Sequence, residues 1–282
     1  MIKTIVFNGG LGNQMFQYAF YLRMRHESPL SFFIFDTEQS RGCHNGFELE
    51  RIFHIDCGWK TKYYRKANKY FQRMIGPFNE IVQKNSLEYV PELMKERHFL
   101  SRYAGFWQSE EYFKPVKKSV RKAFTFREEL LNEKTKETSS YLKSINSVSV
   151  HIRRGDYLRH PDYYGLCTTD YYNKSISLLK ERIPNALFVF FSDDLEWARQ
   201  NINCDNALYV DWNKGKDSWQ DMYLMSCCKH NIVANSSFSW WGAWLNPNPE
   251  KTVAAPKPWF DYSSDYDVAP ANWQRIERYN LQ

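Results

Sequence analysis

The 282-residue sequence predicts an α/β protein with two domains that face each other, each built on a mostly parallel sheet. Short apolar runs alternate with helical segments in both halves of the chain, and this alternation is typical of parallel sheets. The length suits two domains of about 140 residues each. With 43% hydrophobic and 25% charged residues the composition is that of a globular protein, which excludes a disordered chain. We expect the domains to be 1–145 and 146–282.

The first half opens with a β-α-β unit and then becomes mostly helical and aromatic. Its apolar spacing and glycines mark the elements. In order we expect a strand over 2–7, a glycine turn over 9–14, a helix over 15–25, a strand over 32–35, a strand near 103–107 and a long polar helix over 125–145.

The second half alternates more regularly. The crossovers between its parallel strands should all be right-handed. The expected strands are 147–152, 186–192, 207–211, 231–234 and, last, 252–256, separated by helices over 168–183, 194–202, 218–228 and 237–246.

Charge and cysteine content indicate where in the cell the protein works. The net charge of +6 comes largely from local excesses such as residues 60–73, which hold six basic residues and no acid. This stretch is either a solvated helix face or a surface that docks on anionic membrane, and no nucleic-acid recognition signature accompanies it. None of the six cysteines forms a CxxC pair, no secretory signal precedes the first strand, and no apolar run reaches about 18 residues. We expect a cytoplasmic protein, with peripheral contact at the inner membrane face as an option.

Charged and hydroxyl side chains follow three strands of the second domain. The carboxyl ends of parallel strands lie at one edge of the sheet, where ligands of α/β proteins bind. We therefore expect a shared crevice lined by Arg153, Arg154 and Asp156 after the first strand, Asp193 and Asp194 after the second, and Asn235, Ser236, Ser237 and Ser239 at the start of the last helix.

These residue types together predict a nucleoside diphosphate site. A guanidinium suits phosphate, and a helix N-terminus with serines offers N–H and hydroxyl donors to the same ligand. A carboxylate at Asp193 or Asp194 can accept the two N–H groups of a guanine edge. The alternatives are helix capping by the serines and carboxylates, and a surface Arg-Asp pair. The Arg-Gly-Asp tripeptide at 154–156 is too short to indicate adhesion by itself.

Two further motifs are weaker. Gly10 and Gly12 after a strand, with Asp36 ending the next, resemble a dinucleotide fingerprint, but Met15 occupies the third glycine position. The glycines equally let the backbone or Asn13 approach a ligand. The Asp-x-Asp spacing at 265–267 places two carboxylates where they could bind a metal ion, but it lies in a polar tail after the last expected strand, so we expect no metal and no cofactor.

Four motifs carry a resemblance to a known family. GGLGNQMFQYAF, HIRRGDY, FFSDDLEWARQNI and ANSSFSWWGAWLN, in this order and spacing, resemble the α-1,2-fucosyltransferases of glycosyltransferase family 11. The resemblance covers nearly the whole chain and implies a GT-B-like fold of two facing Rossmann-like domains with parallel sheets. It further implies a donor, GDP-β-L-fucose, a terminal β-galactoside acceptor that can be lipid-linked, and metal-independent inversion at the fucose C1, in the soluble bacterial form.

The same resemblance implies roles for individual residues. His151 would lie beside the guanine, Arg153 would hold the β-phosphate with support from Arg154, and Asp193 would read the guanine edge. Asn13 would face the acceptor side of the cleft. The donor-binding set is completed by Asp194, Ser236, Ser237, Phe238, Ser239 and Gly12.

The sequence does not identify the general base. Asp156 is one candidate for taking the proton of the galactose 2-hydroxyl, and its alternative role is a salt bridge to Arg154 or a cap. Asn13 could instead only orient the hydroxyl while the leaving phosphate takes the proton. The competing functions are a fucosyltransferase of another linkage and a glycan-binding protein without catalysis. The second is suggested by Trp240, Trp241 and Trp244, although their helical spacing favours a place in the core.

Overall fold

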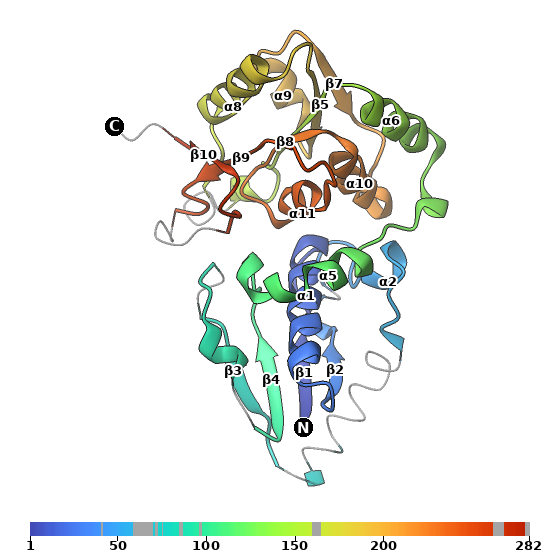
Figure 1. Cartoon of the computed structure of the whole chain (residues 1–282), viewed down its shortest axis with the longest axis vertical. Coiled ribbons are helices and arrows are strands. Elements are labelled where there is room, and N and C mark those ends of the chain that lie inside the picture. Colours follow the sequence, from blue (N-terminus) through green and yellow to red (C-terminus); the bar gives the residue numbers. More distant parts are fainter. Residues whose placement is uncertain are drawn as a thin grey trace. The chain divides into compact units, whose positions relative to one another are not determined.

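The computed structural model describes residues 1–40, 42–58, 70, 73–74, 76–84, 87–95, 98–159, 165–261 and 268–279. They form two compact units, Met1–Arg127 and Glu128–Gln282. Each unit is built on a sheet whose strands all run parallel (Figure 1). The predicted fold class, α/β with two parallel-sheet domains, is confirmed.

Unit 1 is a four-stranded sheet in the order β2-β1-β4-β3. An aromatic cluster packs α1 against it: Phe20 stacks on Trp107 with ring centroids 4.0 Å apart, and Tyr21 meets Phe35 edge-on at 4.8 Å. Such pairs add to the free energy of burial. The elements are β1 (Ile2–Val6), α1 (Leu11–Glu27), β2 (Phe32–Asp36), α2 (Leu49–Ile52), β3 (Asn79–Val82), β4 (Leu100–Ala104) and α5 (Lys117–Ala123).

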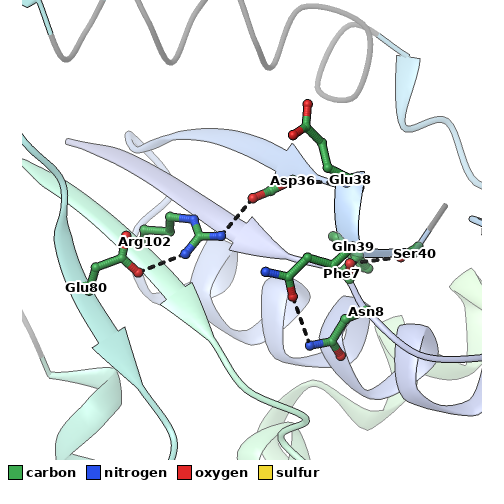
Figure 2. A network of polar contacts seen from close by, with 8 residues as sticks. All are labelled: Phe7, Asn8, Asp36, Glu38, Gln39, Ser40, Glu80 and Arg102. Carbon is green, nitrogen blue, oxygen red and sulfur yellow. Dashed lines mark hydrogen bonds and ion pairs between the residues drawn. The ribbon is translucent and has the colours of Figure 1, made fainter. Parts of the chain in front are cut away.

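One arginine ties three strands of this sheet together. Arg102 of β4 lies between two carboxylates (Figure 2). Its guanidinium nitrogens lie 2.9 Å from Asp36 at the end of β2 and 2.9 Å from Glu80 of β3. Burial alone would lower the pKa of Arg102, but the hydrogen bonds to Asp36 and Glu80 raise it. Asp36 is buried and committed to this ion pair. A role for Asp36 in a dinucleotide fingerprint is therefore not favoured.

Unit 2 has a six-stranded sheet in the order β10-β9-β8-β5-β6-β7. Counted in chain order from β5, this is the order 3-2-1-4-5-6 of a Rossmann fold. The direction of winding reverses between β5 and β8, which are hydrogen-bonded neighbours. The strands are β5 (Ser147–Ile152), β6 (Leu187–Ser192), β7 (Ala207–Val210), β8 (His230–Ile232), β9 (Val253–Lys257) and β10 (Gln274–Glu277).

Helices cover both faces of this sheet. Side chains of α8 and α9, such as Leu179 and Ala198, join Val150 and Phe190 in one apolar cluster. On the opposite face α10 packs against α11 and α6, and Trp240, Trp241 and Trp244 of α11 are buried against one another. The expectation that these tryptophans belong to the core is correct. The helices are α6 (Glu133–Ser144), α8 (Thr169–Arg182), α9 (Leu195–Asn201), α10 (Trp219–Cys227) and α11 (Ser237–Leu245).

Several element boundaries differ from the expectation. α1 begins at Leu11, so part of the expected glycine turn is its first turn. The strand expected near 103–107 is shifted to Leu100–Ala104, and Trp107 lies beyond its end with a left-handed backbone (φ 56°), which does not fit a strand. β3 and β10 were not expected, because each is a partly exposed edge strand without an apolar pattern.

The expected domain boundary near residue 145 is wrong, because the units divide between residues 127 and 128. The polar helix is shorter than expected and begins after its cap, Asn132, whose side chain accepts the N–H of Thr135. Asn132 also donates to Asn213, 2.9 Å away, and to Gln220 through its main-chain N–H, at 3.1 Å. Asn213 in turn donates to Asp221 at 2.9 Å. This buried amide network fastens α6 to α10 and so assigns it to unit 2.

Within the described part of the chain, each helix is too short or too polar to span a bilayer. The basic stretch 60–73 lies almost wholly outside the described residues. Its expected membrane contact therefore stays a prediction.

The buried network generates a prediction about stability and pH. Burial raises the pKa of Asp221 to about 7, although the hydrogen bond from Asn213 acts in the opposite direction. Between about pH 4 and pH 7 the unfolded chain loses a proton that the folded chain keeps. The free energy of unfolding should therefore fall as pH rises through this window, by about 1.4 kcal/mol for each unit of pKa difference.

Asp221→Asn should flatten this pH dependence in urea titrations, since the amide keeps an acceptor for Asn213. Asp217→Asn changes an exposed aspartate of the neighbouring turn and should leave the slope as in the wild type. Equal slopes for Asp221→Asn and wild type would contradict the assignment.

Candidate active site

The candidate site lies in unit 2, where the winding of the sheet reverses. The carboxyl ends of β5 and β8 are neighbours there, and β6 flanks β5. In open α/β sheets ligands bind at this switch point. Two segments meet at it: the arginine loop, residues 153–159 after β5, and the serine segment, residues 235–239 at the start of α11.

Arg153 is held by two carboxylates. Its Nη1 lies 3.0 Å from Asp193 Oδ2, and its Nη2 lies 2.7 Å from Asp156 Oδ1. Burial alone would lower the pKa of Arg153, but the charges of Asp193 and Asp156 raise it. The side chain remains 26% exposed. Arg153 is thus a permanent cation, fixed in direction and still open to an anionic ligand.

Asp193 joins the loops that follow β5 and β6. Its second oxygen, Oδ1, accepts the main-chain N–H of Arg154 at 3.0 Å. Gly155 is required beside it, because a Cβ at that position would lie 2.8 Å from Asp193 Oδ2. Both carboxylate oxygens of Asp193 are therefore engaged by the arginine loop.

Arg154 points to α9. Its Nε lies 3.2 Å from Asp194 Oδ2, and its guanidinium carbon lies 4.0 Å from the ring centroid of Trp197. Asp194 also caps α9 by accepting the N–H of Trp197. The capping alternative therefore holds for Asp194. The alternative role for Asp156 is a salt bridge to Arg154, but the structure pairs Asp156 with Arg153 instead.

The serine segment begins α11. Ser236 caps the helix by accepting the N–H of Phe238 at 3.3 Å. Ser239 is buried, with its hydroxyl directed at main-chain oxygens of Ala234 and Ser236. Ser237 and Phe238 stay partly exposed. Structural hydrogen bonds to the main chain thus account for two of the three serines, Ser236 as the helix cap and Ser239 inside the first turn, while the helix start keeps its partial positive charge.

His151, the next-to-last residue of β5, lies beside this helix start. Its ring centroid is 5.8 Å from that of Phe238. Burial, together with the charge of Arg153, lowers the pKa of His151 to about 3, so the imidazole is neutral at physiological pH. Among the described residues its buried Nδ1 has no hydrogen-bond partner. A buried nitrogen of this kind is normally satisfied, which is consistent with a place beside a ligand.

Sequence reasoning missed Tyr157. Its hydroxyl donates to the main-chain oxygen of Asn235 at 2.9 Å, and its ring centroid lies 5.8 Å from the guanidinium carbon of Arg153. It therefore connects the arginine loop with the serine segment. The only signal in the sequence is an aromatic residue two positions after Gly155, and that alone predicts core packing.

Gly12 and Asn13 belong to unit 1, in the first turn of α1. Asn13 is partly exposed, and its Oδ1 accepts from Gln108 Nε2 at 2.8 Å. Gly9 has a left-handed backbone (φ 70°), and a Cβ on it would lie 2.5 Å from Asn13 Nδ2. The glycine therefore makes room for the Asn13 amide.

Among the described residues, no group of three or more His, Cys, Asp and Glu side chains is arranged to hold a metal ion. Asp265 and Asp267 of the Asp-x-Asp spacing lie outside the described residues.

Comparison with known proteins defines the class. The family model Glycosyl transferase family 11 matches residues 83–277. An α-1,2-colitosyltransferase of Escherichia coli is 36% identical over 96% of this chain and 97% of its own length. The chain therefore belongs to glycosyl transferase family 11 and is a glycosyltransferase, which confirms the family predicted from the four motifs.

Two further similarities are more distant. A galactoside α-(1,2)-fucosyltransferase 1 of Lagothrix lagotricha is 27% identical over 51% of this chain and 42% of its own length. The fold is shared with the NodZ α-1,6-fucosyltransferase co-crystallised with GDP, which has a TM-score of 0.55 and 13% identity over 87% of this chain and 92% of that one.

Proposed function

We propose that the protein moves L-fucose from GDP-β-L-fucose to the 2-hydroxyl of a terminal β-galactoside, with inversion at the fucose C1 and without a metal. The observation that carries the proposal is the fixed, partly exposed Arg153 guanidinium at the switch point. Arg153 follows β5, and α11 follows the neighbouring strand β8. A guanidinium and a helix N-terminus are the donors that a diphosphate requires. The α-1,2 linkage and the galactoside are suggested by the names of the relatives.

In the proposed reaction the bond between the fucose C1 and the β-phosphate oxygen breaks, and its electron pair leaves with GDP. The acceptor oxygen forms the new bond to C1 from the opposite face, and the proton of the acceptor hydroxyl passes to the leaving phosphate of GDP. Negative charge grows on the diphosphate during this step, so a donor already aimed at it stabilises the transition state more than the ground state. Arg153 supplies a fixed positive charge for this purpose and can do so without Mg²⁺.

The carboxylates around Arg153 have distinct places in this proposal. Asp193 is bound on both oxygens by the arginine loop. We therefore assign it the anchoring of Arg153 rather than the recognition of guanine. Asp156 is more exposed and pairs with the other guanidinium nitrogen. We expect the diphosphate to compete with Asp156 for Arg153. This contact favours a positioning role for Asp156 over that of general base.

GDP-colitose is a second candidate donor beside GDP-fucose. The 36% identity to an α-1,2-colitosyltransferase extends over almost the whole chain. Colitose lacks the 3-hydroxyl of L-fucose and otherwise shares its ring, so the same diphosphate contacts serve both sugars. The choice between them rests on side chains that contact the sugar C3.

The proposal predicts the product. Purified protein incubated with GDP-fucose and lactose in EDTA should form a Fucα1-2Gal linkage, identified by NMR, at the rate seen without EDTA. A parallel reaction with GDP-colitose measures the preference between the donors. Hydrolysis without transfer, or a 1,3 linkage, would contradict the function named here. Glycan binding without nucleotide binding would favour a lectin.

Arg153→Ala should lower the transfer rate by about 10² to 10³ fold, as expected for loss of a fixed charge that faces the developing anion. The measurement is kcat/KM for GDP-fucose at saturating acceptor, with circular dichroism to check the fold. Arg159→Ala removes the same charge from an exposed position of the same loop and is the matched control. Equal rates for the two variants would contradict the role of Arg153.

A further inference from the structure

We propose that Tyr157 is a positioning residue that sets the arginine loop at a fixed distance from the serine segment, so that both can bind one diphosphate. The inference rests on the proposed function, because it concerns the same nucleotide site. It adds a residue that does not touch the reacting atoms and acts through Arg153.

The first support is the connection made by the hydroxyl. Tyr157 is 9% exposed, and its O–H donates to the main-chain oxygen of Asn235 at 2.9 Å. The next residue, Ser236, is the cap of α11. Asn235 is itself held in place, since its Nδ2 donates to the main-chain oxygen of Gly165 at 2.9 Å. The hydroxyl of Tyr157 therefore binds a main-chain oxygen that is itself held in place, next to the start of α11.

The second support is the coupling of Tyr157 to Arg153. The Arg153 guanidinium carbon lies 5.8 Å from the Tyr157 ring centroid, within the range of a cation–π contact. Main-chain hydrogen bonds from Leu158 to Arg154 (2.8 Å) and from Arg159 to Asp156 (3.2 Å) close the loop around Tyr157. A shift of the ring would therefore move the arginine loop.

These contacts bear on recognition because a diphosphate needs donors from both segments at once. A displacement of about 1 Å of the groups that support a binding site is enough to weaken ligand binding or catalysis at that site. Asp193 fixes Arg153 relative to β6, and Tyr157 fixes it relative to β8 and α11. Phenylalanine would fill the same space as Tyr157, so only the hydroxyl bond distinguishes positioning from packing.

The chain offers a matched control. Tyr171 of α8 is also buried, and its hydroxyl donates to the main-chain oxygen of Val233, 2.5 Å away, two residues before Asn235. It belongs to α8, outside the arginine loop. Tyr171→Phe therefore deletes a buried hydroxyl bond to the same strand end without touching the support of Arg153.

The experiment compares GDP with guanosine by calorimetry for wild type, Tyr157→Phe and Tyr171→Phe. Tyr157→Phe should weaken GDP binding about five- to tenfold, the equivalent of one lost hydrogen bond, and guanosine binding by less than about twofold. Tyr171→Phe should lower the melting temperature but leave the ratio of the two affinities at the wild-type value. In an Arg153→Ala background, Tyr157→Phe should have no further effect on GDP binding.

Three outcomes would overturn the inference. They are an unchanged ratio of affinities in Tyr157→Phe, an equal change in Tyr171→Phe, and full additivity with Arg153→Ala. The last two would reduce Tyr157 to a structural residue while wild type still prefers GDP, so the proposed function would stand. A wild-type protein that binds GDP no more tightly than guanosine would overturn the proposed function together with the inference.

Discussion

The candidate site depends on the carboxylate of Asp193 more than on any other group. One of its oxygens holds the side chain of Arg153 and the other holds the main chain of Arg154, so a single residue after β6 sets both the direction of the cation and the path of its loop. Without this anchor a guanidinium in a surface loop would lose rotamer entropy each time it bound a ligand. Gly155 follows from the same constraint, since the carboxylate occupies the space of a side chain there. Three successive residues, Arg153, Arg154 and Gly155, thus depend on the position of one carboxylate.

The two units use different chemistry at equivalent places. In unit 1, β1 and β4 are the neighbours between which strand order reverses. Besides the ion pair of Arg102 with Asp36, the groups there are amides: Gln17 donates to Asn8 and Gly105, and Gln108 donates to Asn13. In unit 2 the corresponding groups are charged and prepared for an anion. The arrangement agrees with a neutral, hydroxyl-rich sugar being handled by one unit and a nucleotide by the other in the proposed function.

The sequence predicted five of the six strands of unit 2, because these are short apolar or alternating runs bounded by turn residues, whereas β10 has no such pattern. The placement of the residues after these strands followed from the parallel sheet. It could not predict which arginine pairs with which carboxylate. Arg153 and Arg154 are adjacent and identical in type, and only the alternation of side chains at the end of β5 sends one to Asp193 and the other to Asp194 and Trp197. The domain boundary failed for a similar reason: the buried amides of Asn132 and Asn213 have no apolar signature. Tyr157 was missed because a buried aromatic residue reads as core whatever its hydroxyl does.

A crystal structure of the protein with GDP would show which groups bind the diphosphate. We expect the diphosphate to lie between the Arg153 guanidinium and the first turn of α11, with Asp193 still paired to Arg153 and the Tyr157 hydroxyl still on Asn235. A nucleotide bound elsewhere on unit 2, or a diphosphate at this edge with Arg153 still paired to both Asp156 and Asp193 and turned away from it, would contradict this expectation.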